Sequence, residues 1–144
     1  MNKETKKISK VKIYSDGGAR GNPGPGAIGV LICDGREQPL KDHRETLGDV
    51  TNNVAEYTAV IVGLELARKL GAKEIEYFVD SELIARQITG KYRVKTPHLQ
   101  TLFNQVKALE KFFTKVTFTH VPRTHERLRY VDRLVNQALD EAGY

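Results

Sequence analysis

Three carboxylates stand beside apolar segments of the chain. Asp16 ends a run of β-type residues, Glu56 lies in the first turn of a long apolar helix, and Asp80 follows an apolar strand. Carboxylates at such places are costly to desolvate unless they are paired or bound to a cation. Oxygen ligands of this type suit a hard divalent cation such as Mg2+. If the fold brings the three together, they form a metal site.

Each carboxylate also has an ordinary structural interpretation. Asp16 can begin a turn, Asp80 can cap a helix next to Ser81, and Glu56 can complete a capping box that begins at Asn53. Asp16 and Asp80 converge only if the first and fourth strands are adjacent. Spacing along the sequence does not show that adjacency, so both interpretations stay open here.

Hydrophobic periodicity predicts the elements that must position these residues. A meander of three strands precedes a long helix, and the full order is βββαβαααβα, with one pair of helices free to merge. Residues 17–26 are too rich in glycine and proline for a regular element and are expected to form a loop. The expected strands are residues 11–15, 27–33, 40–47, 75–79 and 116–120, and the expected helices begin near residues 54, 81, 97 and 131.

The composition is that of a single globular domain. The chain has 144 residues, 40% of them hydrophobic, and a net charge of +5. Most of that charge comes from lysines in the first twelve residues, so we expect a flexible basic tail over residues 1–10 and one domain over residues 11–144. Cys33 is the only cysteine, which excludes an internal disulfide and fits a cytoplasmic location. No segment is apolar enough to enter a membrane.

Other segments could contact a polyanion. Residues 24–29 match GxGxxG, but a β-rich segment follows in place of the helix that dinucleotide binding requires. Basic clusters at residues 91–95 and 123–133 either bind phosphates or face solvent. His120 should point inward from the last strand, whereas His125 lies in a polar stretch where a mobile imidazole could move protons. Side chains suited to phosphate or 2′-hydroxyl contacts are those of Asn22, Thr51, Asn52, Asn53 and Ser81.

Four longer motifs carry a resemblance to a known family. They are YSDGGARGNPGPGAIG, TNNVAEYTAVIVGLELA, VDSELIARQITGKYRVK and VDRLVNQAL. Together they resemble the type 1 ribonuclease H family, from Val11 to about Ala142. The first three occur in order, and each places an acidic residue at the family's metal-binding position.

This resemblance implies an α/β fold with a five-stranded mixed sheet, three strands antiparallel and two parallel, and helices on both faces. Strands one and four are then adjacent. Asp16, Glu56, Asp80 and Asp132 look like the family's catalytic, metal-binding carboxylates, with His125 as a catalytic residue on a loop. The substrate contacts that the resemblance implies are Gly17, Asn22, Thr51, Asn52, Asn53 and Ser81.

Two features depart from the family's pattern. The stretch between Arg123 and Asp132 is longer than the usual loop, and only residues 90–96 join the short helix to the next one. The basic handle that some family members carry between those helices is therefore missing. Affinity for a nucleic acid would then depend on the basic residues 91–95.

The function that the resemblance implies is hydrolysis of the RNA strand of RNA–DNA hybrids, with 5′-phosphate and 3′-hydroxyl products. Two Mg2+ ions would serve as cofactors, with Mn2+ as a substitute, and the protein is expected to act as a monomer. Double-stranded RNA is a further candidate substrate. The alternatives are a metal-dependent DNA nuclease or resolvase of the same fold, and a non-catalytic binder of hybrids or double-stranded RNA. The asparagines favour RNA, and carboxylates without metal chemistry would only weaken the binding of a polyanion.

Overall fold

A computed structural model describes residues 8–144. These residues form one five-stranded sheet with four helices. Their order is βββαβααβα, so two helices, rather than three, separate the fourth and fifth strands. The elements are β1 (Lys10–Ala19), β2 (Gly24–Asp34), β3 (Pro39–Val50), α1 (Asn52–Lys69), β4 (Glu74–Val79), α2 (Glu82–Ile88), α3 (Pro97–Glu110), β5 (Lys115–His120) and α4 (Glu126–Glu141).

The strand order across the sheet is β3-β2-β1-β4-β5. The strands β1, β2 and β3 pair antiparallel, while β4 is parallel to β1 and β5 is parallel to β4. The expected mixed sheet is therefore confirmed, together with the adjacency of the first and fourth strands. That adjacency is the condition under which Asp16 and Asp80 can converge.

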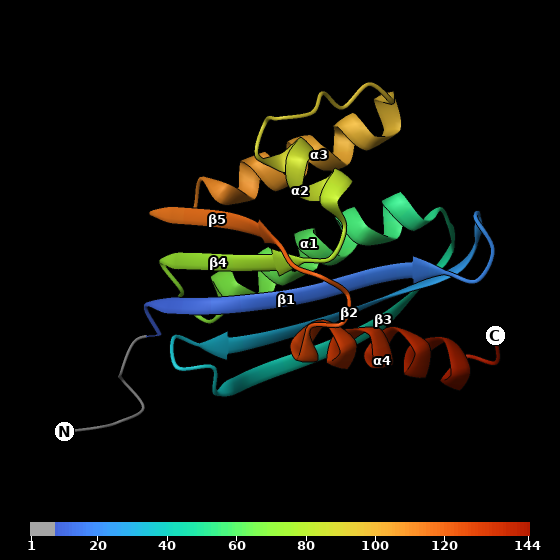
Figure 1. Cartoon of the computed structure of the whole chain (residues 1–144), viewed down its shortest axis with the longest axis horizontal. Coiled ribbons are helices and arrows are strands. Elements are labelled where there is room, and N and C mark those ends of the chain that lie inside the picture. The colour runs from blue at the N-terminus through green and yellow to red at the C-terminus, as the bar shows by residue number, and fades with distance from the viewer. Residues whose placement is uncertain (1–7) are drawn as a thin grey trace.

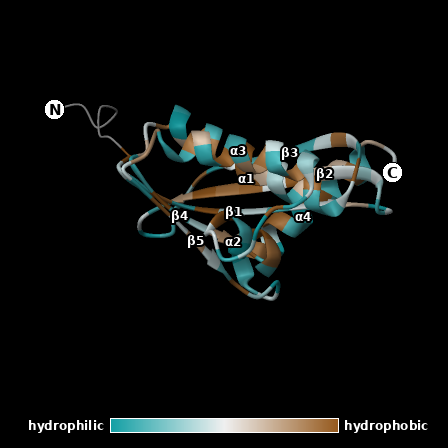
Figure 2. Ribbon diagram, turned by 90° about the horizontal axis from the view of Figure 1, so that it is seen from above, coloured by the Kyte–Doolittle hydropathy of each residue, from teal (hydrophilic) through white to brown (hydrophobic). Residues whose placement is uncertain are grey.

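Helices cover both faces of the sheet (Figure 1). On one face, α1, α2 and α3 pack over a core that includes Ile13, Leu64 and Ile88, all buried. On the other face, α4 packs by itself over Tyr14 and Leu31. Figure 2 shows the hydrophobic residues concentrated on the strands and on the helix stripes that turn toward them. No helix within residues 8–144 is long and apolar enough to cross a membrane.

Two buried hydroxyl groups fix the position of α1. The hydroxyl of Tyr77 on β4 lies 2.8 Å from Oγ of Ser15 and 3.2 Å from the carbonyl oxygen of Ala59. The hydroxyl of Tyr57 donates to Oε1 of Gln87 at 2.6 Å and so connects α1 to α2. Because buried polar groups are costly to leave unpaired, these contacts restrict how α1 can lie on β1 and β4.

The glycine-rich segment is mostly strand, which corrects the expected loop over residues 17–26. β1 continues through Ala19 and pairs with β2 as far as Gly26, so only residues 20–23 form the turn. A Cβ on Gly17 would lie 2.2 Å from the carbonyl oxygen of Ala55. Only glycine fits at this position, because α1 approaches the strand closely. Since β1 continues to Ala19, Asp16 lies inside the strand rather than at its end.

The helix starts also differ from the sequence expectation. Thr51, not Asn53, is the N-cap of α1, since its hydroxyl oxygen accepts from the amide of Val54. Glu56 is therefore in the second helical turn. The last helix begins at Glu126, so most of the stretch between Arg123 and Asp132 is helical and is not a long loop.

Two further expectations need correction at the ends of strands. His120 is exposed at the end of the edge strand β5 and is not an inward structural histidine. At the other end of the chain, β1 already begins at Lys10, which forms an ion pair of 2.7 Å with Glu76. Residues 1–7 of the expected tail lie outside the described residues.

Candidate active site

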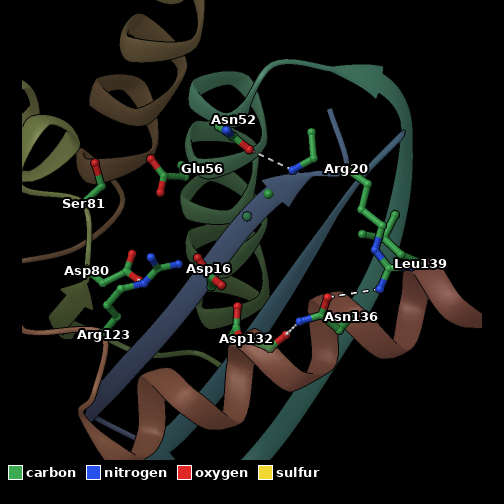
Figure 3. Close-up of a pocket in the computed structure, with 13 residues that line it drawn as sticks. Asp16, Arg20, Asn52, Glu56, Asp80, Ser81, Arg123, Asp132, Asn136 and Leu139 are labelled. Carbon is green, nitrogen blue, oxygen red and sulfur yellow. Dashed lines mark hydrogen bonds and ion pairs between the residues drawn. The ribbon is translucent and has the colours of Figure 1, made fainter. Parts of the chain in front are cut away.

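The carboxylates meet where β4 ends beside β1. The pairing of the two strands stops at Tyr14 and Phe78, and β4 itself ends at Val79. Beyond that point, β1 still pairs with β2, but Asp16 has no neighbouring strand on the side of β4. Glu56 reaches this place from α1, and Asp80 follows directly from β4, so one helix and two strands of the sheet contribute to the site (Figure 3).

The three predicted core carboxylates are close enough to share a cation. Asp16, Glu56 and Asp80 each offer an oxygen atom, and these atoms lie within 4.8 Å of one another. All three residues are half-buried. Asp132 projects toward the same place from the exposed side of α4, on the opposite face of the sheet from Glu56 (Figure 3).

The electrostatics of this carboxylate cluster are those of mutually repelling acids. Burial, together with the charges of Asp80, Asp132 and Glu56, raises the pKa of Asp16 to about 8. Burial, with Asp80, likewise raises the pKa of Glu56 to about 7, although Ser81 and Arg123 lower it. The pKa of Asp80 is also raised, chiefly by burial. Such shifts are expected where carboxylates are held together without a counter-cation.

The cluster lies in a cleft of about 440 Å³. Its walls include Gly17, Asn52 and Ser81, which were predicted to contact a substrate. Asn52 is held in place because its Oδ1 accepts from the amide of Ala19 at 2.9 Å. Ser81 is the N-cap of α2, with its hydroxyl oxygen accepting from the amide of Ile84 at 3.2 Å.

The other predicted substrate residues lie in a neighbouring depression. Asn22, Thr51 and Asn53 line this second pocket together with Thr96 and His98 at the start of α3. Oδ1 of Asn22 accepts from the amide of Asn52 at 3.0 Å, so the two pockets meet at the N-terminus of α1.

His125 lines neither of these two pockets. It is the N-cap of α4, and its Nδ1 accepts from the amide of Arg127 at 3.1 Å. Its ring stacks on that of Tyr14, with 5.5 Å between the centroids. The ring is thus fixed at a helix start, in contrast to the mobile loop position that the sequence suggested.

Three polar residues of the cleft were not assigned to the site from the sequence. Arg123 lies 3.7 Å from Oδ2 of Asp80 and had been placed only in a basic cluster. Arg20 and Asn136 line the cleft on the side away from Asp80 (Figure 3). Asn136 stands one helical turn after Asp132, and this spacing is the one sequence signal that could have found it.

Comparisons with known proteins show the family to which this fold belongs. A family model described as reverse transcriptase-like matches residues 14–138. The ribonuclease H1 of Halobacterium salinarum is 38% identical, with a TM-score of 0.89 over 92% of this chain and 99% of that chain. The chain belongs to the ribonuclease H family. A ribonuclease H1 solved in complex with an RNA/DNA hybrid is 42% identical, with a TM-score of 0.86 over 92% of this chain and 98% of the other.

Some ribonuclease H relatives are longer proteins. A bifunctional protein of Mycobacterium tuberculosis is 42% identical over 135 residues, which make up 93% of this chain. The chain spans only 36% of that protein's length. Its N-terminal ribonuclease H domain, solved as a fusion with maltose-binding protein, matches with a TM-score of 0.88 over 93% of this chain and 96% of that chain.

Proposed function

We propose that the chain hydrolyses the RNA strand of RNA–DNA hybrids and leaves 5′-phosphate and 3′-hydroxyl ends. The observation that carries the proposal is the convergence of Asp16, Glu56 and Asp80 within 4.8 Å in a ribonuclease H fold. A relative of 42% identity has been solved with an RNA/DNA hybrid, which supports this choice of substrate.

The cluster fits divalent cations of the Mg2+ type. All of its donors are carboxylate oxygens, which suit Mg2+ and Mn2+ better than softer metals. Burial and the charges of neighbouring carboxylates raise the pKa values of Asp16 and Glu56, and a bound divalent cation would favour their ionised forms. Two Mg2+ ions held there would supply an activated water and positive charge for the departing 3′-oxygen.

The residues divide between two cation positions. Asp16 is the proposed bridge, because the charges of Asp80, Asp132 and Glu56 all act on it. Glu56 would complete one position, and Asp80 with Asp132 the other. One chain supplies all four carboxylates, so we propose that a monomer is active.

Substrate recognition is assigned to the polar residues around the cluster. Asn22, Asn52 and Asn53 would read 2′-hydroxyls of the RNA strand, which distinguish RNA from DNA. Thr51 would hold a phosphate of the DNA strand beside the N-terminus of α1, where backbone amides favour an anion. Gly17 and Ser81 border the carboxylates and would contact the strand that is cut.

The test is a strand-labelled cleavage assay with and without Mg2+. We expect the RNA strand of a hybrid to be cut only when Mg2+ or Mn2+ is present, with 5′-phosphate products. A single 2′-deoxy substitution near the cut should slow cleavage, because it removes a hydroxyl contact.

Matched duplexes serve as controls. Duplex DNA, double-stranded RNA and the DNA strand of the hybrid are assayed at the same concentrations. Cleavage of duplex DNA at a comparable rate would favour a DNA nuclease or resolvase. Tight binding of the hybrid without any cleavage would favour a non-catalytic binder.

A further inference from the structure

The cleft has an uneven distribution of charge. Its lining holds four carboxylates at the centre, and the lining cations among the described residues are Arg20 and Arg123. Arg123 lies beside Asp80, whereas Arg20 lies on the far side of Asp16 (Figure 3). A polyanionic strand that crosses the carboxylates would therefore meet one cation before them and another after them.

Arg20 is held in the cleft by the C-terminal half of α4. Its Nη2 donates to Oδ1 of Asn136 at 3.1 Å and lies 2.8 Å from Oδ1 of Asp140. Its Nη1 donates to the carbonyl oxygen of Tyr144. A guanidinium has five N–H groups. Those on Nε and the second one on Nη1 make no hydrogen bond within residues 8–144, so they are available to a ligand.

These contacts orient Arg20 without burying it. Its side chain is 36% exposed and that of Asp140 is 68% exposed. Exposed ion pairs of this kind contribute little to stability, about 0–1 kcal/mol, so an incoming phosphate can replace Asp140 at small cost. A guanidinium also matches a phosphate group by two parallel hydrogen bonds.

We propose that Arg20 binds a backbone phosphate of the RNA strand on the opposite side of the carboxylates from Arg123. This inference rests on the proposed function, because it assigns the path of the strand that is cut. The strand then runs along the cleft from Arg123, over Asp16, to Arg20. Asn136 and Asp140 keep the guanidinium turned toward that path before the substrate arrives.

The test compares Arg20→Ala with Arg44→Ala in the intact chain. Arg44 on β3 forms an ion pair of 2.8 Å with Glu141 at the end of the same helix, but it does not line the cleft. The two variants therefore lose similar ion pairs. Binding of a fluorescently labelled RNA–DNA hybrid is measured by anisotropy over a range of salt concentrations, with KM and kcat for cleavage alongside.

We expect Arg20→Ala to weaken hybrid binding and raise KM by roughly tenfold, with a slope of log affinity against log salt that is lower by about one. Arg44→Ala should leave the affinity and the slope unchanged. Arg20→Lys should restore most of the salt slope but only part of the affinity, because it keeps the charge and loses the planar fork.

Asp140→Ala tests whether Arg20 binds the hybrid itself or acts only through its ion pair with Asp140. It removes the ion-pair partner but keeps Arg20, so hybrid affinity should be equal to or higher than that of the wild type. The proposal is overturned if Arg20→Ala behaves like Arg44→Ala, or if Asp140→Ala weakens binding as much as Arg20→Ala does. If the wild-type chain neither binds nor cuts the hybrid, the proposed function fails instead, and this outcome is seen before any variant is compared.

Discussion

The ring of Tyr14 on β1 stacks on the ring of His125 at the start of α4, with 5.5 Å between their centroids. Tyr14 is itself fixed, because its hydroxyl donates to the carboxylate of Glu37 at 2.8 Å and its ring stacks on Phe78 at 4.9 Å. Since Nδ1 of His125 accepts the amide proton of Arg127, Nε2 is the ring nitrogen left for proton exchange. The imidazole is held in one orientation.

This relationship predicts two separable effects at His125. If Nε2 takes part in proton movement, His125→Ala should lower turnover by on the order of tens to thousands, with little change in hybrid affinity. The same change removes a helix cap and should cost about 1 kcal/mol of stability. His125→Asn keeps a capping side chain without an imidazole. Turnover and thermal melts are measured for both variants. If turnover is lost in His125→Ala but restored in His125→Asn, His125 acts only as a helix cap.

Asp16→Asn should abolish cleavage and stabilise the metal-free protein. The substitution removes a proposed bridging ligand, while the contacts that hold phosphates stay, so hybrid binding should be nearly retained. It also removes a carboxyl group whose pKa folding raises to about 8, so folding near pH 7 no longer requires the uptake of a proton at this position. This change should stabilise the fold by about 1–3 kcal/mol in EDTA. Thermal melts over a range of Mg2+ concentrations measure both effects. A variant that melts lower in EDTA, or gains as much from Mg2+ as the wild type, would contradict a shared metal site.

The stability of the metal-free protein should fall as pH rises from about 4 to about 8. Folding raises the pKa of Asp16 from 3.8 to about 8 and that of Glu56 from 4.5 to about 7. In this window the unfolded chain has lost these protons while the folded chain still holds them, so each step up in pH favours unfolding. Chemical denaturation at several pH values, in EDTA, checks the slope. Saturating Mg2+ should remove this slope, and a flat profile in EDTA would show that folding does not raise the pKa values of Asp16 and Glu56.

Gly17→Ala should disturb the site through the backbone. The new Cβ would lie 2.2 Å from the carbonyl oxygen of Ala55, so α1 must move away from β1 and take Glu56 with it. We expect a loss of about 1–3 kcal/mol of stability and a marked loss of turnover. Gly18→Ala is the matched control, since its Cβ would meet only Oδ1 of Asn52, at 4.0 Å. Equal behaviour of the two variants in melts and cleavage assays would refute the close approach.

Local signals placed several elements correctly. Thr96 followed by Pro97 marks the start of α3, and Gly71, with φ of +83°, follows the end of α1. Such features depend on the conformation of a few neighbouring residues, and these can be read along the chain. The types of the site residues were equally visible, because carboxylates beside apolar segments are unusual wherever they occur.

Other features depend on contacts between segments that are distant in sequence. The glycines after Asp16 were expected to end β1, but pairing with β2 and the close approach of α1 keep them in the strand. The inward position expected for His120 was wrong, since β5 is an edge strand and its last residue faces solvent. Glycine tolerates both a turn and a strand, so the choice is made by its tertiary neighbours.

The sequence by itself determined which residues can do chemistry and, through its family motifs, which fold they belong to. Only the tertiary structure decided that Glu56 and Asp132 approach Asp16 from opposite faces of the sheet, and that Arg20 lies in the cleft with them. Charge and hydrogen-bonding capacity are properties of each residue. Proximity depends instead on where β4 stops beside β1 and on how α1 and α4 pack over the strand.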